Sequence, residues 1–473
     1  MNEFRRRQST GSPTRVAIVV DNPRRDLRGL VLLAHEFVKL DAQVYLVPMY
    51  QQGYDLPLLA PDLVVVNYAR ENNRALLETY RALGYRIAVL DTEGGVLSES
   101  GLDSPLNWAR GMRESGLADL IDYYCFWGEA VRDAFAEHSG IKAEALAVTG
   151  CPRYDLCCPP WSEVLEYARR GFVLVNTNFS AINPQFTSSA EDESRIFKSL
   201  GWDALYVEGL FEDLKAVFPR YLDAVEAIAR NFPDKIVQVR PHPFENPQVY
   251  RDRFDELANV VVDGEGDILN AIFAAERVVH LNCGSAVDAV RLGKIPISLE
   301  YLNTERMQRH APLPSRLSCQ AQDQDMLLSL VAGQGTVAAC YDETVARREV
   351  ERWYYLSDGL SARRVAHFLA ARLSVQERAP VRSLGAAVRG GRPSASGRQF
   401  LRGVVGALIG SGPASVLTEL VQSSRREKRI ELPVVFNLLD QYRRLDDSGM
   451  VVAAFARNPL TGVPLSTIAV RKK

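Results

Sequence analysis

The sequence has almost no net charge and no long apolar run. It contains 56 Lys and Arg against 58 Asp and Glu, a net charge of -2, so no overall charge draws the chain to nucleic acid or to a membrane. No uninterrupted apolar stretch reaches the roughly 18 residues that a spanning helix needs. Residues 1–14 are basic and polar, without the apolar core of a secretory signal. We therefore expect a cytoplasmic protein that does not bind nucleic acid.

Metal-binding and common catalytic motifs are also missing. The seven cysteines include no CxxC pair and have no metal-site spacing with histidine, so we expect all of them to be reduced. The P-loop, HExxH, EF-hand and GxSxG patterns are absent. The sequence therefore predicts neither a metal site nor a cofactor, and it excludes P-loop, zincin and α/β-hydrolase chemistry.

What the sequence does contain is an alternation of strand-like and helical patterns. With 473 residues, 47% hydrophobic and 24% charged, the chain has the composition of a globular protein with two or three domains. Alternation at this spacing is typical of doubly wound parallel sheets. We expect strands at residues 15–20, 44–47, 63–66, 86–90, 123–127 and 144–148, and a second series at 172–175, 235–239, 260–262, 277–281 and 295–299.

These two series predict an α/β protein with two tandem Rossmann-like domains. The expected boundaries are 15–160 and 161–372, followed by a basic linker and a C-terminal extension of unknown fold at 373–473. Between the strands we expect a helical piece ending at Arg170, an irregular connection over 180–206, and a helix kinked or broken at Pro219.

A polar corner follows the apolar run at 235–239. Arg240 and His242 come directly after it, and Pro241 and Pro243 prevent the strand from continuing. In open α/β sheets, ligands bind at the carboxyl ends of strands. Arginine can bind a phosphate through two hydrogen bonds and histidine can donate one. We therefore predict a phosphate contact here; the alternative is a turn in which His242 packs on its own backbone.

A second polar loop follows the strand expected at 277–281. Asn282, Gly284 and Ser285 precede a helical pattern, and the first amides of a helix are unpaired and favour anions. We predict an anion site with the Ser285 hydroxyl facing outward; the alternative is an ordinary helix cap. Asn178, in the polar tip that follows the strand expected at 172–175, is a further candidate.

Acidic residues follow the strand expected at 86–90. Asp91 and Glu93 stand next to Gly94 and Gly95, which permit close approach of a substrate. A partly buried carboxylate can have a raised pKa and act as a general base. The alternative is a solvated turn in which Asp91 caps backbone amides.

Two arginines, Arg24 and Arg25, follow the first expected strand. Their position at a strand end allows them to contact an acidic acceptor. The alternative is a helix start at 21–23 with solvated arginines.

These motifs together resemble those of GT-B glycosyltransferases. Asp91–Gly94 resembles the acidic motif of bacterial sialyltransferases and related enzymes that use CMP-activated sugars, and Arg240–Pro243 resembles their His-Pro motif. Bacterial surface carbohydrate biosynthesis proteins and the Kdo transferases of capsule and lipopolysaccharide assembly are similar over residues 15–370. The resemblance implies that Asp91 or Glu93 is the general base, that His242 contacts the donor phosphate, and that Ser285 belongs to a phosphate loop.

The resemblance implies a metal-independent glycosyltransferase that moves a sugar from a CMP-linked donor to a surface polysaccharide or glycolipid. The alternatives are a UDP-sugar transferase or epimerase of the same fold, and a non-catalytic scaffold. Basic residues at 389–398 and 424–429 flank an apolar stretch at 401–421. These segments can hold the protein at the inner face of the plasma membrane, unless they form an ordinary helical subdomain.

Overall fold

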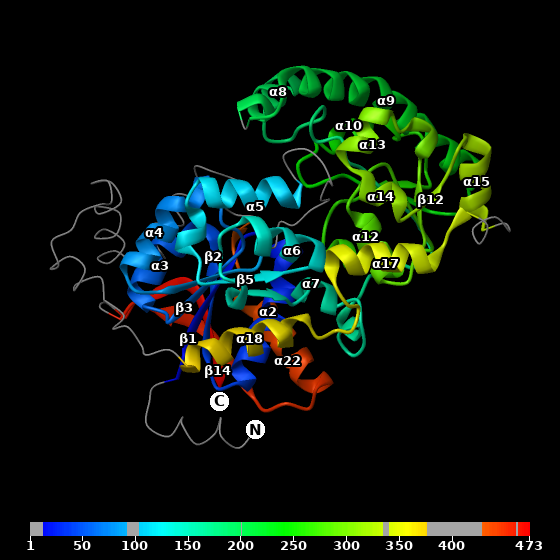
Figure 1. Cartoon of the computed structure of the whole chain (residues 1–473). Helices are drawn as coiled ribbons and strands as arrows, with labels where there is room; N and C mark the ends of the chain where they lie inside the picture. The colour runs from blue at the N-terminus through cyan, green and yellow to red at the C-terminus, as the bar shows by residue number, and fades with distance from the viewer. Residues whose placement is uncertain (1–12, 92–103, 200, 334–339, 376–427, 460–461) are drawn as a thin grey trace. The chain divides into compact units, whose positions relative to one another are not determined.

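The computed structural model describes residues 13–91, 104–199, 201–333, 340–375, 428–459 and 462–473. The chain divides into two compact units. The first comprises Met1–Glu93, Ala109–Val164 and Asp358–Lys473, and the second comprises Gly94–Trp108 and Leu165–Ser357. Each unit contains one sheet (Figure 1). The α/β class and the two Rossmann-like sheets predicted from the sequence are therefore confirmed.

The sheet of the first unit has the strand order β13-β14-β2-β1-β3-β4-β5-β6. The strands from β2 to β6 are parallel. They consist of short apolar runs, as sheets covered on both faces require. The order reverses between β1 and β3, and doubly wound sheets bind ligands at such a point. The parallel strands are β1 (Arg15–Val20), β2 (Gln43–Pro48), β3 (Leu63–Val66), β4 (Arg86–Val89), β5 (Tyr123–Phe126) and β6 (Leu146–Val148).

Helices of the first unit begin where the sequence offers caps. Asn22 accepts hydrogen bonds from the amides of Arg24 and Arg25, and Pro23 occupies the first turn of α2. The helices are α2 (Pro23–Lys39), α3 (Gln52–Leu59), α4 (Arg74–Ala82), α5 (Pro105–Glu114), α6 (Glu129–His138), α7 (Pro152–Asp155), α18 (Ser361–Val375) and α22 (Leu432–Leu445). Part of α5, up to Trp108, is grouped with the second unit.

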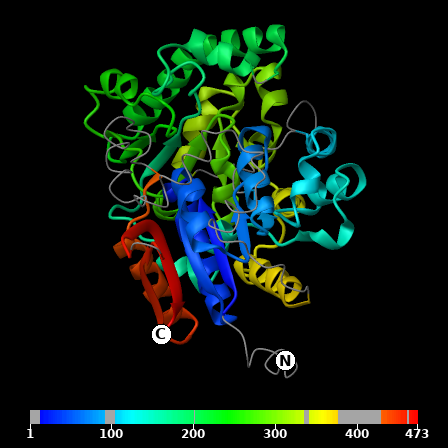
Figure 2. The same ribbon diagram turned by 90° about the vertical axis from the view of Figure 1, so that its left-hand side faces the viewer.

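The described end of the chain is grouped with the first unit; the sequence predicted a C-terminal extension of unknown fold from residue 373. Strand β14 (Pro464–Lys472) pairs antiparallel with β2, with Ile468 opposite Leu46, and β13 (Val451–Arg457) pairs with β14. Figure 2 shows this red hairpin beside the blue N-terminal strands. An uncovered β2 would expose unpaired backbone groups. The terminal hairpin therefore closes an edge that residues 15–160 leave open.

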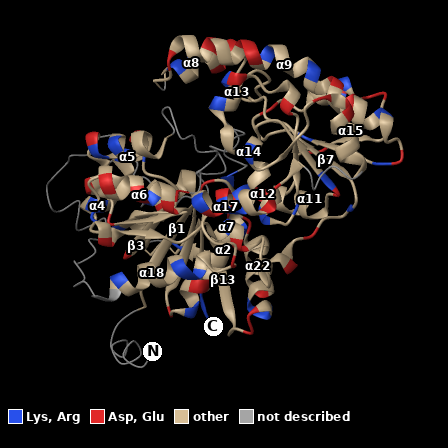
Figure 3. Cartoon of the chain, turned by 45° about the vertical axis from the view of Figure 1, so that its right-hand side comes forward, with Lys and Arg blue, Asp and Glu red and all other residues tan. Residues whose placement is uncertain are grey.

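The sheet of the second unit has the order β12-β11-β10-β7-β8-β9 and is parallel throughout. The order in which the chain adds strands reverses at the neighbouring strands β7 and β10. Charged residues lie mainly on helices and loops, while the strands are largely tan (Figure 3). The strands are β7 (Val173–Asn176), β8 (Val237–Arg240), β9 (Val260–Val262), β10 (Arg277–His280), β11 (Pro296–Ser298) and β12 (Cys319–Gln320).

The helices of this unit correct three expectations. Residues 180–206 contain α8 (Ala190–Ser199), whose first turn carries three acidic residues that favour a helix N-terminus. Helix α9 (Ala204–Asn231) continues through Pro219, so the break expected there is absent. Residues 161–170 form only a short 3-10 turn, Trp161–Val164. The other helices are α10 (Gln248–Arg253), α11 (Ile268–Ala274), α12 (Ser285–Arg291), α13 (Glu305–His310), α14 (Pro312–Arg316), α15 (Gln324–Ala332) and α17 (Glu343–Tyr354).

Two cysteines differ from the sequence-based expectation. Cys319 of β12 and Cys340 form a disulfide, so not all seven cysteines are reduced. Their separation of 21 residues in the sequence gave no local signal for the pairing. None of the described helices has the length and apolar character to cross a membrane. The segments at 389–398 and 401–421, expected at a membrane surface, lie outside the described residues.

A buried ion cluster fixes the C-terminal part of the first unit to α2. His35 Nε2 lies 3.0 Å from Asp446 Oδ2, and Lys39 Nζ donates to Glu36 at 2.7 Å and to Asp446 at 2.9 Å. His35, Glu36 and Asp446 have their ligand atoms within 4.8 Å of one another, as a metal site would require. The Lys39 ammonium already supplies the positive charge among them, which indicates an ion-pair cluster.

We expect Asp446→Asn to lower the free energy of unfolding at pH 7 by about 1.5–3 kcal/mol, the range for hydrogen bonds to charged groups. Burial opposes ionisation, but hydrogen bonds from His35, Ser448 and Lys39 hold the pKa of Asp446 well below its ordinary value. This stabilisation is complete above the unfolded pKa of about 4 and is lost as the pH falls through the folded-state pKa. Urea denaturation at pH 7 and pH 3 measures both effects.

The exposed neighbour Asp447 provides the matched control, because Asp447→Asn makes the same charge change without these contacts. Equal midpoints for the two variants at pH 7 would contradict the role of the cluster.

Candidate functional site

In the first unit, the sequence-predicted Asp91 lies at the carboxyl end of β4. Its backbone is left-handed, with φ of 50°, and the residue is only 5% exposed. Its Oδ2 accepts a hydrogen bond of 2.9 Å from the Tyr124 hydroxyl, and Arg70 lies 3.6 Å from Oδ1. Oδ1 has no hydrogen-bond partner among the described residues. A buried carboxylate oxygen without a donor is costly, and the general-base role that the sequence assigned to Asp91 remains a prediction.

Burial raises the pKa of Asp91 from 3.8 to about 6, although Arg70, the Tyr124 hydroxyl and Arg25 each oppose the shift. A carboxylate with this pKa is ionised at neutral pH and is basic enough to accept a proton from a substrate. The solvated turn that the sequence left open is therefore wrong for Asp91. Glu93 lies outside the described residues.

Asp155 shows why the raised pKa alone does not mark a site. Burial also raises its pKa to about 6. Its two carboxylate oxygens accept the amides of Ser361 and Ala362, at 2.8 and 2.7 Å, where α18 begins. Asp155 is thus a helix cap with both oxygens occupied. Asp91 differs from it in having one oxygen that no described donor satisfies.

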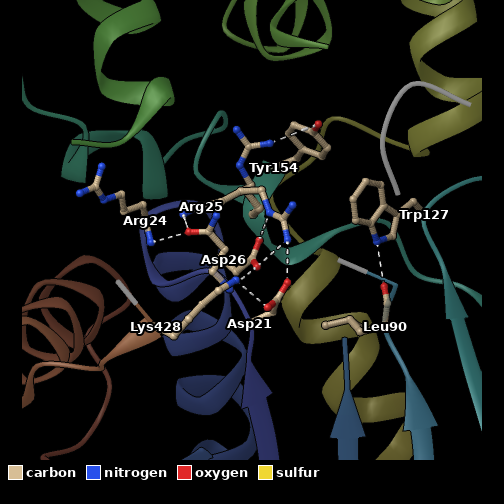
Figure 4. Close-up of polar contacts among 10 residues, drawn as sticks. Asp21, Arg24, Arg25, Asp26, Leu90, Trp127, Tyr154 and Lys428 are labelled. Atoms are coloured by element: carbon tan, nitrogen blue, oxygen red, sulfur yellow. Dashed lines mark hydrogen bonds and ion pairs between the residues drawn. The ribbon is translucent and has the colours of Figure 1, made fainter. Parts of the chain in front are cut away.

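The end of β4 is held in place by an aromatic side chain. Trp127, which follows β5, donates from Nε1 to the Leu90 carbonyl at 2.9 Å (Figure 4). This contact fixes the residue that precedes Asp91. The carboxylate is therefore positioned by neighbours on both sides of the strand end.

Arg24 and Arg25 stand at the start of α2, beside the end of β1 (Figure 4). Arg25 donates to both oxygens of Asp26, at 2.6 and 2.9 Å, and lies 3.8 Å from Asp21. Lys428 donates to Asp21 at 2.8 Å. Arg25 is thus largely committed to neighbouring carboxylates, while Arg24 is exposed. The acidic acceptor contact predicted for these two arginines remains a prediction.

In the second unit, His242 lies in the turn after β8. Its Nδ1 accepts a hydrogen bond of 3.3 Å from the Phe244 amide. The backbone contact that the sequence left as an alternative is therefore present. It also has a chemical consequence: because Nδ1 accepts, the neutral ring carries its proton on Nε2 and can donate it to a ligand.

A buried carboxylate, Glu245, anchors this turn. Glu245 accepts the Thr177 hydroxyl at 2.8 Å, the Phe179 amide at 2.7 Å and the Tyr250 hydroxyl. The Thr177 hydroxyl oxygen also accepts the His242 amide, at 3.1 Å. Burial raises the pKa of Glu245 to about 7. The turn that carries His242 is thus tied to the end of β7 through buried polar contacts.

The role predicted for Arg240 needs correction. Its NH1 and NH2 groups donate to the carbonyls of Glu265 and Gly266, at 2.7 and 2.5 Å. Arg240 is buried, and this desolvation lowers its pKa. The two guanidinium nitrogens that the sequence assigned to a phosphate are used to hold the loop after β9. Arg240 therefore shapes the end of the sheet rather than presenting a charged fork.

Ser285 also differs from the expectation. Its hydroxyl points inward: it accepts from Asn176 Nδ2 at 3.0 Å and donates to Cys283 Sγ at 3.2 Å. Gly284 is the N-cap of α12 and provides no side chain. The hydroxyl faces inward because its partners Asn176 and Cys283 lie at the ends of β7 and β10. It joins the two strands at the point where the sheet reverses.

Asn178 and Asn282 lie at this same reversal point. Asn178 Nδ2 donates to the Asn282 carbonyl at 2.9 Å. Asn282 has a left-handed backbone, with φ of 49°, and exchanges two amide hydrogen bonds with Asn303, at 2.7 and 3.0 Å. Asn176 is 3% exposed, and its Oδ1 has no partner among the described residues. The structure thus brings together the second-unit candidates that the sequence predicted.

Several residues of these sites escaped the sequence analysis. Tyr124 lies inside a strand and Arg70 follows another, and neither carries a local motif. Glu245 stood next to the His-Pro corner, and Asn303 followed the last predicted strand. A polar residue just beyond a buried strand was the available signal for three of these four; Tyr124 had none.

Comparison with known proteins shows that the chain resembles several solved structures in fold. No family model and no curated protein matches the sequence. Among solved structures, UDP-GlcNAc 2-epimerases from Neisseria meningitidis and Methanocaldococcus jannaschii each share 13% identity, with TM-scores of 0.44 and 0.42. Each alignment covers 76% of this chain and 100% of the epimerase. A variant of the wall teichoic acid polymerase TagF shares 8%, with a TM-score of 0.48, 76% of this chain and 89% of its own. Similarity of this size does not identify a function.

We expect Asp91→Asn to leave the protein at least as stable as the wild type at pH 7. The folded-state pKa of Asp91 is raised, so its ionised form costs stability above about pH 6, and this cost disappears as the pH falls below the unfolded value of about 4. Asparagine also tolerates the left-handed backbone. The stability difference between variant and wild type, measured in urea, should shrink from pH 7 to pH 4.

Asp155→Asn is the contrasting control, since it removes a cap from two amides and should cost about 1–3 kcal/mol. Equal destabilisation by the two substitutions would mean that Asp91 is a structural residue.

Proposed function

We propose that the protein is a glycosyltransferase that uses a nucleotide-activated sugar, with Asp91 as its general base. The observation that carries the proposal is the carboxylate of Asp91: buried, with a pKa near 6, and with Oδ1 lacking a partner among the described residues. Such a group is suited to accept the proton of an acceptor hydroxyl while the hydroxyl oxygen attacks the sugar.

On the acceptor side, Asp91, Tyr124 and Arg70 act together, and two arginines are further candidates. Asp91 Oδ1 takes the proton, and the Tyr124 hydroxyl keeps Oδ2 oriented through its 2.9 Å hydrogen bond. Arg70, 3.6 Å from Oδ1, favours the ionised form before the proton arrives. Arg24 and Arg25 can meet negative charge on the acceptor glycan or glycolipid.

On the donor side, the second unit supplies hydrogen-bond donors. As the anomeric bond breaks, negative charge grows on the leaving phosphate. Nε2 of His242 can donate a hydrogen bond to that phosphate. Preorganised donors stabilise developing charge because they need no reorganisation during the reaction. The loop at Asn282, Gly284 and Ser285, beside Asn178, lies at the sheet reversal where nucleotides bind in this fold class.

Two classes of nucleotide-sugar substrate are candidates. The motif resemblance favours a CMP-linked sugar and a role in surface polysaccharide synthesis. A UDP-sugar transferase or epimerase is the second candidate; the two epimerases of similar fold named above have crystal structures with bound UDP-GlcNAc. A measurement of nucleotide binding distinguishes the two classes.

We expect Asp91→Asn to lower kcat by about 10²–10⁴-fold, the usual contribution of a general base. Wild-type activity should fall below about pH 6, because protonated Asp91 cannot act as a base. Tyr124→Phe removes a hydrogen bond that favours the ionised form, so the acidic limb should move to higher pH. Release of sugar to a glycan acceptor, followed from pH 5 to pH 8, measures these effects.

Tyr123→Phe is the control, because Tyr123 lies on the same strand but its charged neighbours are Arg86, Asp122 and Arg372 rather than Asp91. A pH profile that stays in place for Tyr124→Phe would rule out the proposed role of Asp91.

We expect one pyrimidine nucleotide class, CMP or UDP, to bind the wild type, and His242→Ala to weaken that binding about 10- to 150-fold, the loss of one hydrogen bond to a charged group. His138→Ala, in the first unit, should bind normally. Isothermal titration calorimetry with both nucleotides provides the comparison.

Tighter binding of UDP would favour the second candidate. A wild-type protein that binds neither nucleotide would instead be a non-catalytic scaffold of this fold.

A further inference from the structure

Two phenylalanine rings stand exposed at the carboxyl end of the second sheet. Phe186 is 48% exposed and Phe244 is 56% exposed. Their ring centroids are 5.8 Å apart, in an edge-to-face arrangement. Single exposed apolar residues are common in proteins, but two adjacent exposed aromatic rings form a small surface of defined geometry. Neither ring belongs to the hydrophobic core clusters of the unit.

The backbone holds these rings in fixed positions. Pro184 and Glu245 form an antiparallel bridge, the Gln185 amide donates to the Phe244 carbonyl at 2.8 Å, and the Asn246 amide donates to the Asn183 carbonyl at 3.0 Å. This short ladder joins the segment after β7 to the turn after β8. The backbone that carries the two rings is therefore held by hydrogen bonds, which lowers the cost of ordering this segment when a ligand binds.

Burial of Glu245 shows that the fold maintains this turn at a cost. Glu245 lies beside Phe244 in the chain, is 1% exposed, and has its pKa raised to about 7 by burial. Its three hydrogen bonds, from Thr177, Phe179 and Tyr250, fix the residue between the exposed ring and the sheet. A fully satisfied buried polar network specifies one conformation, so these hydrogen bonds hold the turn that carries Phe244.

The pair is continuous with the candidate phosphate contact. The rings of His242 and Phe244 have centroids 5.5 Å apart, and the Phe244 amide fixes the tautomer of His242. Building on the proposed function, we propose that Phe186 and Phe244 form a stacking surface for the pyrimidine base of the nucleotide whose phosphate contacts His242. Every nucleobase presents a flat π face that stacks on aromatic side chains. A rigid, solvent-facing ring beside a phosphate donor fits that ligand class.

The test compares nucleotides with a ligand that lacks the base. Ligand-observed NMR titrations with CMP, UMP and ribose 5-phosphate use the wild type, Phe244→Ala and Phe186→Ala. We expect each alanine variant to bind CMP and UMP about 5- to 150-fold more weakly, as alanine substitution of a stacking residue does, and to bind ribose 5-phosphate as the wild type does.

Two further variants keep the outcome interpretable. Phe244→Leu retains an apolar side chain without a π face and should lose affinity for the nucleotides as well. Phe436→Ala removes another phenylalanine, 51% exposed on α22 of the first unit, and should change nothing. Urea denaturation of each variant verifies that the second unit remains folded.

Each unfavourable outcome has a separate meaning. If the wild type binds nucleotides and both alanine variants bind them equally well, the stacking surface is rejected while the proposed function stands. If the alanine variants lose ribose 5-phosphate as strongly as CMP, the rings maintain the turn and do not hold a base. If the wild type binds no nucleotide, the stacking surface and the proposed function are both rejected.

Discussion

Parallel strands buried on both faces leave little room for polar side chains away from their ends. In the second sheet, Val173, Val175, Val237 and Val239 are completely buried, and most of the polar residues follow where those strands end. Gln238, inside β8, is an exception and donates to the Tyr167 hydroxyl. Polar groups at such an edge lie half inside the protein, so each needs a partner there. Glu245 meets this requirement with three donors. The conformation of the His242 turn, and the exposure of Phe244, follow from satisfying that one carboxylate.

The same constraint gives opposite results in the first sheet. Asp155 and Asp91 are both buried beyond strand ends, with pKa values raised to about 6. Two amides of α18 offset the desolvation of the Asp155 carboxylate. Asp91 accepts only the Tyr124 hydroxyl, and its backbone is in the left-handed region. An arrangement of this kind stores free energy at a site instead of minimising it. The difference between the two residues lies in their partners and not in their burial.

Local pattern predicted the elements and the strand ends. The apolar β-branched runs gave β1 and β3 with the bounds that the structure shows, and Asn22 marked the start of α2. It also put His242, Asn282 and Asp91 just past strands, because the carboxyl end of a strand is visible in a sequence. Which side chain satisfies which group is not visible there. The pairing of Ile468 with Leu46, the Cys319–Cys340 disulfide and the Tyr124 hydrogen bond all join segments whose contact depends on the assembled sheet.

The correction to Arg240 bears on the chemistry of the donor side. A guanidinium that donates to the carbonyls of Glu265 and Gly266 does not supply its fork to a phosphate. Among the described residues at the ends of β7, β8 and β10, Asn178 and Asn282 donate to neighbouring protein groups, and His242 accepts the Phe244 amide at Nδ1. Neutral donors offset less charge than an arginine does.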